Sequence, residues 1–238
     1  MEKNKKRYNI IDFLRGFTII NMIIYHGIYD LEAFYGIEIP YNLYYYQQYI
    51  CMSFILISGL SLNFSKNYFK KFLILTGVSI AITLATFLFD KNEAIYFGII
   101  HFFAAAMLIH IIFENFIKKI NPKFGLIICL ILFIIFKRIY YGNIFFGLID
   151  IPNSLYNLNL FVLGLPSPSF SSADYFPIIP WIFLFYVGYF FYDFIDLKKK
   201  EASKNIINIM GRHSLVLYIV HQIVLVVLLS IVFYFVGS

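Results

Sequence analysis

The sequence predicts an all-α membrane protein, a polytopic helical bundle with about seven transmembrane helices. Of its 238 residues, 61% are hydrophobic and only 13% are charged, whereas soluble domains average about 45–50% apolar and about 25% charged residues. Apolar stretches long enough to cross a bilayer, which takes about 20 helical residues, recur along the chain. Lys and Arg gather in alternate connections between these stretches. We therefore expect a single transmembrane domain over residues 1–238.

Seven stretches are predicted to span the membrane, to within a few residues at each boundary. They cover residues 9–30, 44–63, 70–89, 95–117, 123–140, 177–196 and 213–236. The first resembles a signal peptide, but it contains Asp12 and Arg15 and lacks a small-residue cleavage site, so we expect it to remain as a helix. Cys51 and Cys129 lie in apolar stretches without a CxxC pattern, which predicts buried thiols rather than a disulfide or metal site.

The basic residues predict the orientation of the chain. One set of connections is rich in them: Lys3, Lys5, Lys6, Arg7, Lys66, Lys70, Lys71, Lys118, Lys119, Lys123, Lys198, Lys199, Lys200 and Lys204. The other set holds only Lys91, Lys137 and Arg138. Because cytoplasmic loops carry the excess of Lys and Arg, the N-terminus is predicted to be cytoplasmic and the C-terminus extracytoplasmic. The protein is then a multi-pass protein of the inner or plasma membrane.

The longest connection, residues 140–176, is predicted to lie on the outer side. It is rich in Gly, Pro, Ser and Asn but also contains apolar patches. Long connections without a function are uncommon. Three alternatives stay open for this segment: it lies on the membrane, it re-enters the membrane to cover a site, or it forms an extra pair of short spans.

The first span carries four residues that are costly inside a membrane: Asp12, Arg15, His26 and Asp30. Helical spacing places them on one stripe, with Asp12 and Arg15 within reach of each other and His26 within reach of Asp30. The two pairs are separated by about 16 Å along the axis. Arg15 could bind phosphate or carboxylate near the cytoplasm. His26, oriented by Asp30, could transfer protons near the outer face. The alternative is two local ion pairs that only fix helix packing.

Other polar residues allow two interpretations each. His101, close to Gly98, lines a cavity or bonds a neighbouring helix. Asp174 caps the sixth span or serves as an acid group at an external site. Arg212 meets lipid phosphates or provides a second anion contact near Arg15. Ser214 and His221 are seven residues apart, so they share a face of the last span.

Together these residues resemble the heparan-α-glucosaminide N-acetyltransferase catalytic-domain family, within the wider group of transmembrane acyltransferases. The resemblance rests on motifs that run from the first span to the last. They are IDFLRG from Ile11, NMIIYH from Asn21, DL from Asp30, SGLSL from Ser58, GIIHF from Gly98, SADYFP from Ser172, PW from Pro180, GRHSL from Gly211, and Tyr218 with His221 and Gln222. Each motif is weak alone, and their order and spacing are fairly specific.

The resemblance implies a membrane enzyme that takes an acyl group, usually acetyl, from cytoplasmic acyl-CoA and delivers it to a sugar hydroxyl or amine outside. Arg15 would help to hold CoA, and His26 would be the catalytic histidine. The chain departs from the lysosomal members, which are longer, have Asn at the place of His26 and carry their catalytic histidine further along. It is more similar to the small bacterial members.

We therefore expect an acetyltransferase that uses acetyl-CoA or another acyl-CoA, without a metal ion or a nucleic-acid partner. Its expected partners are membrane lipids and a sugar or glycan acceptor, and homo-oligomer formation stays open. The candidate catalytic residues are His26 and Asp30. The candidate CoA-binding residues are Arg15, Asp12, His101, Arg212, Ser214 and His221, and those for the acceptor are Asp174, Tyr175 and Trp181. The alternative function is a proton-coupled transporter of a small solute, with the first span as the proton relay.

Overall fold

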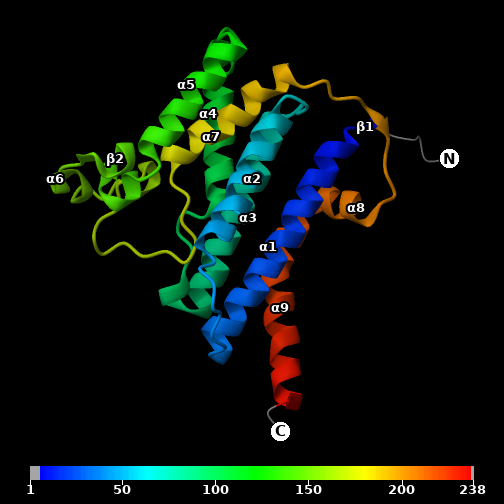
Figure 1. The fold of residues 1–238 in the computed structure, drawn as a ribbon, viewed down its shortest axis with the longest axis vertical. Coiled ribbons are helices and arrows are strands. Elements are labelled where there is room, and N and C mark those ends of the chain that lie inside the picture. The colour runs from blue at the N-terminus through cyan, green and yellow to red at the C-terminus, as the bar shows by residue number, and fades with distance from the viewer. Residues whose placement is uncertain (1–5, 237–238) are drawn as a thin grey trace. The chain divides into compact units, whose positions relative to one another are not determined.

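A computed structural model describes residues 6–236 and shows a mostly helical protein (Figure 1). The described residues form nine α-helices: α1 (Asn9–Tyr35), α2 (Tyr44–Leu62), α3 (Tyr68–Phe89), α4 (Ile99–Ile117), α5 (Pro122–Phe136), α6 (Asn153–Tyr156), α7 (Ile178–Phe191), α8 (Ile206–Arg212) and α9 (Ser214–Val236). Two antiparallel ladders join β1 (Lys6–Arg7) to β4 (Lys200–Glu201) and β2 (Asn143–Ile144) to β3 (Ile149–Asp150). Short 3-10 turns are η1 (Lys91–Glu93), η2 (Ile139–Tyr141), η3 (Phe145–Gly147), η4 (Phe161–Leu163) and η5 (Tyr192–Phe194).

Each of the seven predicted spans coincides with a helix, namely α1, α2, α3, α4, α5, α7 and α9. Four segments are long and apolar enough to cross a membrane: Tyr68–Phe89, Ile99–Ile117, Pro122–Tyr141 and Ser214–Phe235. Polar side chains such as Arg15 and Gln47 lower the hydropathy of α1 and α2, and α7 is shorter. A mostly helical fold with four candidate membrane-spanning helices is therefore confirmed, while the count of seven spans and the orientation of the termini stay predictions. Lys3 and Lys5, used for that orientation, lie outside the described residues.

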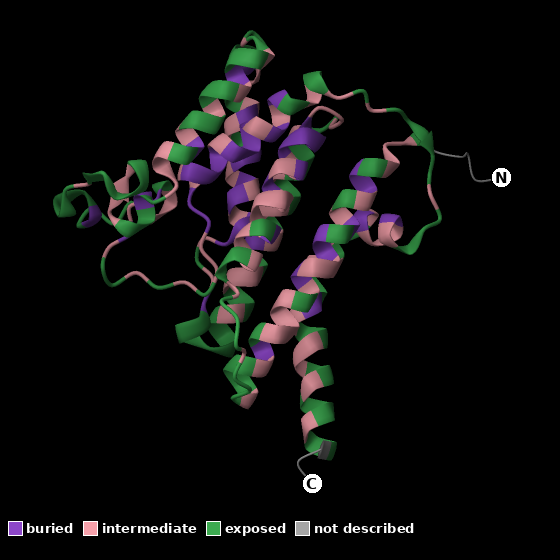
Figure 2. Ribbon diagram, in the orientation of Figure 1, coloured by how far each residue is buried: buried purple, intermediate pink, exposed green. Residues whose placement is uncertain are grey.

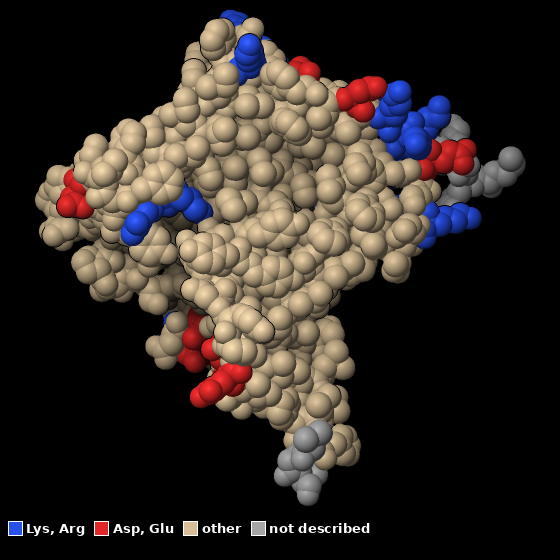
Figure 3. Space-filling model, viewed as in Figure 1, with Lys and Arg blue, Asp and Glu red and all other residues tan. Residues whose placement is uncertain are grey.

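The surface of these helices suits contact with lipid. Only 6% of the most apolar window of α3 is buried, and the same share holds for α9. Figure 2 shows exposed and half-buried residues along α9, and Figure 3 shows that uncharged residues cover most of the visible face. Apolar side chains can stay exposed in this way when their solvent is the hydrocarbon of a bilayer.

The described chain divides into two compact units. The first contains residues 6–57 and 196–236, and the second is Ser58–Ile195. Helix α2 belongs to the first unit up to Ile57 and to the second unit from Ser58. The prediction of one transmembrane domain over residues 1–238 stays a prediction.

In the first unit, α1 packs against α8 so closely that backbone meets backbone (Figure 1). A Cβ atom on Gly16 would collide with the carbonyl oxygen of Ile207, and one on Gly211 would collide with the carbonyl oxygen of Asp12. Small residues permit this approach between membrane helices. Nδ2 of Asn208 also donates to the carbonyl oxygen of Asn9 at 2.6 Å. The glycines therefore fix α8 beside the start of α1.

Helix α9 packs against the later part of α1. Asp30 is completely buried there, and Nε2 of Gln222 donates to both of its carboxylate oxygens at 2.9 Å. α1 continues past the predicted boundary at residue 30 and ends at Tyr35. A hydrophobic cluster of this unit contains Ile19, Met22 and Ile50, and Leu217 and Tyr218 of α9 pack against it. The Asp30–Gln222 pair therefore fixes the register of α9 along α1.

In the second unit, α3 pairs with α4, α5 pairs with α7, and α4 also contacts α7. Phe102 of α4 and Phe185 of α7 are almost fully buried, and their ring centroids are 6.3 Å apart. Figure 2 shows buried residues (purple) along both helices. The last turns of α2 join this core, because Gly59 meets the backbone of Phe185.

Residues 140–176, all of which the structure describes, fold as a series of short elements between α5 and α7. Their longest helix is α6, with four residues, so the alternative of an extra pair of spans is wrong. The backbone N–H of Ile151 donates to the carbonyl oxygen of Gly142 at 2.8 Å, and the Tyr156 hydroxyl donates to the carbonyl oxygen of Ile139. These bonds give the segment a defined conformation.

We predict that Gly16→Ala separates α1 from α8 and destabilises the protein. The added methyl group has no room against backbone atoms, and overpacking of this kind costs about 1–3 kcal/mol. Thermal unfolding in detergent should show a lower Tm. Gly27→Ala is the matched control in the same helix, because its Cβ would lie 3.7 Å from a Leu225 methyl carbon, an ordinary contact. Equal Tm values for the two variants would contradict the close contact.

We also predict that Gln222→Leu is more destabilising than the double variant Asp30→Leu with Gln222→Leu. The single change leaves a buried carboxylate without its donor, which costs about 1–3 kcal/mol, whereas removing both partners removes that penalty. Unfolding in mixed detergent micelles would measure both variants. A double variant less stable than Gln222→Leu would show that Asp30 does not depend on this amide.

Candidate active site

The start of α1 carries an ion pair that differs from the expected one. Asp12 is buried and accepts hydrogen bonds from Nε of Arg7 at 2.8 Å and from Nη2 of Arg7 at 3.2 Å. The predicted partner, Arg15, is not bonded to it. The pairing of β1 with β4 holds Arg7 at the start of α1. The hydrogen bond to Asp12 raises the pKa of Arg7, so the guanidinium of Arg7 stays charged.

Arg15 is therefore left without a direct partner. It is half-buried, and within residues 6–236 it makes no hydrogen bond or ion pair. A guanidinium group in this position retains its donors for a ligand, and its planar fork suits phosphate and carboxylate groups.

Arg212 approaches the same region because of the glycine contact. The backbone nitrogen of Gly211 lies 3.0 Å from the position that a Cβ on Gly16 would take. Arg15 precedes Gly16 and Arg212 follows Gly211, so the backbones of the two arginines are close. Nη1 of Arg212 donates to the carbonyl oxygen of Ser203 at 2.9 Å. Ser214 begins α9 two residues later and is half-buried. The α1–α8 contact thus brings the backbones of two arginines from distant parts of the sequence close together.

The later part of α1 brings His26 beside His221 of α9. Their ring centroids are 4.8 Å apart, with an angle of 60° between the rings. Nδ1 of His221 lies 2.6 Å from the carbonyl oxygen of Tyr218. A carbonyl only accepts, so Nδ1 carries the proton and Nε2 is the basic nitrogen. Nε2 is buried without a hydrogen-bond partner among the described residues. The pair therefore contains a nitrogen lone pair that is free to take a proton.

Asp30 does not orient His26 as predicted. Its carboxylate oxygens are held by Gln222, the residue after His221. Asp30 therefore fixes α9, the helix that carries His221, rather than His26 itself. The sequence alone predicts His221 among the CoA-binding residues. A histidine deep in a membrane span needs a polar partner inside the bundle, and this was the available signal that His221 lies near another polar group.

His101, in the second unit, has both ring nitrogens occupied. Nδ1 accepts from the backbone N–H of Gly98 at 3.2 Å, and Nε2 lies 3.0 Å from Oγ1 of Thr83. The Thr83 hydroxyl donates to the carbonyl oxygen of Ile95 at 2.7 Å, so it accepts from Nε2–H. This geometry supports the structural interpretation, in which His101 bonds a neighbouring helix.

Asp174 caps a helix, but the helix is α4 rather than the sixth predicted span. Its Oδ2 accepts from the backbone N–H of Ile99 at 3.0 Å, which satisfies a free donor at the N-terminus of α4. The residues after Asp174 lie beside the segment before α4, and the N–H of Phe176 donates to the carbonyl oxygen of Phe97 at 2.8 Å. Asp174 thereby ties the connection before α7 to the start of α4.

Tyr175 and Trp181 lie in aromatic surroundings of the second unit. The Tyr175 hydroxyl donates to the carbonyl oxygen of Phe161, and burial raises its pKa, so the hydroxyl keeps its proton. Trp181 is buried, and Nζ of Lys137 lies 3.9 Å from its ring centroid. A ring covered in this way offers little open surface to a sugar. Among residues 6–236, no group of three or more His, Cys, Asp or Glu could hold a metal ion.

The comparisons with known proteins follow this geometry. No curated protein and no solved structure matches the chain. A family model described as heparan-alpha-glucosaminide N-acetyltransferase, catalytic, matches residues 7–223. The matched range begins at Arg7 and ends just after Gln222, so it contains the whole polar stripe of α1 and its partners on α8 and α9. The chain therefore belongs to the heparan-α-glucosaminide N-acetyltransferase catalytic family, whose members are membrane transferases of the acetyltransferase type.

Proposed function

We propose that the protein transfers an acyl group, most simply acetyl, from cytoplasmic acyl-CoA to a hydroxyl or amine of a sugar or glycan on the outer side. One observation carries the proposal. Among the described residues, the Arg15 guanidinium near the start of α1 has no hydrogen-bond partner, and further along α1 His26 lies beside His221 of α9, whose Nε2 has none either. A cation for a polyanionic donor and a base for an acceptor are the two groups that this transfer needs.

The donor site is assigned to the start of α1. CoA carries phosphate groups, and Arg15 keeps donors available for them. Arg212 directly follows Gly211 of the α1–α8 contact and would add a second cation. Ser214 supplies a hydroxyl at the start of α9. Hydrogen bonds between guanidinium and phosphate are charge-assisted and are among the stronger polar contacts in proteins. Asp12, bonded to Arg7, helps to hold the start of α1 and does not bind the donor directly.

The imidazole pair is assigned to acyl transfer. The acceptor oxygen or nitrogen attacks the thioester carbonyl while His26 removes its proton, with His221 as the neighbouring acceptor. A new C–O or C–N bond forms, the C–S bond breaks, and CoA leaves as a thiolate that takes up a proton. We favour this direct attack over an acyl-histidine intermediate. Asp30 and Gln222 act as positioning residues, because they fix α9 and hence His221 against His26.

A proton-coupled transporter is the second candidate, since polar residues along a membrane helix can relay protons. Membership of the acetyltransferase family favours the enzyme. The two functions differ in one simple property, because only the enzyme needs acyl-CoA.

We predict that acetyl-CoA raises the Tm of the detergent-solubilised protein and that Arg15→Ala weakens this binding. Loss of charge-assisted hydrogen bonds costs about 1.5–3 kcal/mol, which raises the Kd roughly ten- to a hundredfold. Arg138→Ala is the matched control, because Arg138 is exposed and, within residues 6–236, its guanidinium contacts the ring of Tyr141 at 5.9 Å without an ion pair. If acetyl-CoA leaves the Tm unchanged and a solute gradient drives uptake into vesicles, the transporter is correct.

A separate prediction concerns the chemistry. His26→Ala should abolish detectable acyl transfer, since loss of a general base lowers rates by about 10²–10⁴-fold, while acetyl-CoA still raises the Tm. Release of free CoA thiol in the presence of a glycan extract would measure the transfer. Ile24→Ala, at an exposed position of the same helix, should keep full activity. Full activity in His26→Ala would remove this histidine from the mechanism.

A further inference from the structure

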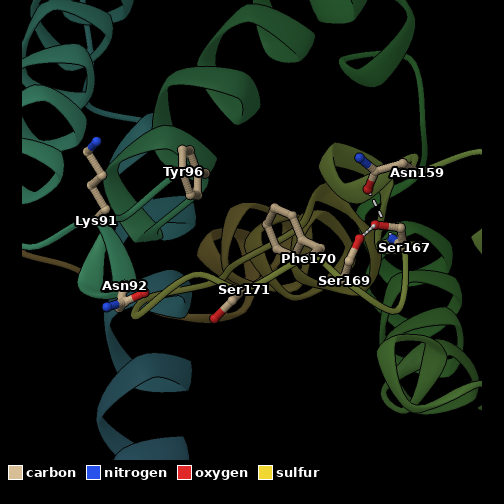
Figure 4. A pocket seen from close by; sticks show the side chains of 8 residues that line it. All are labelled: Lys91, Asn92, Tyr96, Asn159, Ser167, Ser169, Phe170 and Ser171. Atoms are coloured by element: carbon tan, nitrogen blue, oxygen red, sulfur yellow. Dashed lines mark hydrogen bonds between the residues drawn. The ribbon is translucent and has the colours of Figure 1, made fainter.

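An open pocket of about 410 Å³ lies in the second unit, apart from every residue assigned above (Figure 4). Its volume falls in the range of about 300–1,000 Å³ that is typical of small-molecule sites. It is lined by Lys91, Asn92, Tyr96, Asn159, Ser167, Ser169, Phe170 and Ser171. These residues come from η1, from the strand-like segment before α4 and from the connection between α6 and α7. The pocket is therefore assembled by the long outer connection, residues 140–176, against the turn that joins α3 to α4.

The polar groups of the pocket combine donors with acceptors. Oδ1 of Asn159 accepts from the backbone N–H of Ser167 at 3.0 Å, and the hydroxyls of Ser167 and Ser169 are 3.2 Å apart. Figure 4 shows these three side chains together at one end, with Asn92 and Lys91 at the other. The side-chain amide of Asn92 makes no hydrogen bond to another described residue. The amides at the two ends and the serine hydroxyls at one end can donate and accept, which matches a ligand that bears several hydroxyl groups.

Aromatic rings form the apolar part of the pocket. Phe170 is stacked on Phe161, with ring centroids 4.9 Å apart, and contacts Tyr175 at 5.1 Å. The ring of Tyr96 lies 6.4 Å from Phe170. Phe170 is therefore held in place by Phe161 and Tyr175, while Tyr96 and Phe170 border the pocket together. Rings of this kind pack against the C–H face of a pyranose, while the polar groups bind its hydroxyls.

The charge around the pocket favours a neutral ligand. Lys91 is the charged residue of the lining, and within the described chain it forms no ion pair. Its chain neighbours in the same turn include Asp90 and Glu93, which offset its charge at short range. Its Nζ lies 5.5 Å from the ring centroid of Phe87, so the ammonium group of Lys91 also makes a cation–π contact outside the lining. The lining contains no carboxylate that would select an amine.

From this lining we infer that the pocket binds an uncharged, hydroxyl-rich sugar of one or two pyranose rings. The claim that this sugar is the acceptor rests on the proposed acyl transfer. The claim that the pocket binds a sugar rests on the pocket alone. The chemical class comes from the mixed amide and hydroxyl groups, the two rings and the offset charge of Lys91.

Saturation-transfer NMR on the full-length protein in nanodiscs tests this site without any donor present. The probes are the neutral disaccharides maltose, cellobiose and N,N′-diacetylchitobiose, with galacturonic acid and glucosamine as charged comparisons. At least one neutral disaccharide should show a saturation-transfer signal, which indicates binding. Ser171→Trp, which fills the pocket, should abolish it, and Asn92→Ala should weaken binding by about tenfold. The matched controls Ser154→Trp and Asn157→Ala, at exposed positions outside the lining, should bind as the unchanged protein does.

Three outcomes would overturn the inference. They are an absence of the saturation-transfer signal for every neutral sugar, a signal for a charged sugar alone, and an equal signal in Ser171→Trp. The Tm shift with acetyl-CoA, measured on the same variants, confirms that they are folded and separates the two proposals. If acetyl-CoA binds and the pocket variants still bind sugar, the pocket assignment fails while acyl transfer stands. If the neutral sugar binds in the pocket but acetyl-CoA has no effect, the donor assignment fails while the sugar site stands.

Discussion

The contact between Gly16 and Gly211 is the constraint on which the arrangement of the first unit depends. Two helices can meet backbone to backbone only where neither carries a Cβ atom, and here both positions are glycine. The contact places α8 beside the start of α1, and since α9 follows α8 after a single residue, it also determines where α9 begins. Asp30 and Gln222 then fix the other end of the α1–α9 pair.

A membrane protein must satisfy most of its polar groups internally, and this makes the exceptions informative. Asp12, Asp30, His101 and Asp174 all have hydrogen-bond partners in the described chain, and each holds two segments together. Arg15 and the Nε2 atom of His221 have none. The groups that stabilise the fold are thus distinct from these two groups, which remain available for a ligand, and the proposed donor and proton-transfer sites each contain one of the two.

The connection between α5 and α7 illustrates how a loop can be ordered without a long helix. Hydrogen bonds from Tyr156 and Tyr175 to backbone carbonyl groups hold its turns, and Asp174 anchors its end to α4. Stacked rings of Phe161 and Phe170 supply its apolar core. This order is what allows the connection to form one wall of a pocket.

The sequence by itself determined the helical membrane fold, the positions of all seven main helices and the polar stripe of α1, because hydropathy and helical spacing are local properties. It also contained the motifs of the family. It could not determine the partners of the stripe. Asp12 and Asp30 were within reach of Arg15 and His26 on one helix, yet they bond Arg7 and Gln222, since the strand pairing of Arg7 and the docking of α9 offered closer donors. The contact between His26 and His221, which are far apart in the chain, and the polar pocket were decided only by the tertiary structure, because both arise where distant segments pack together.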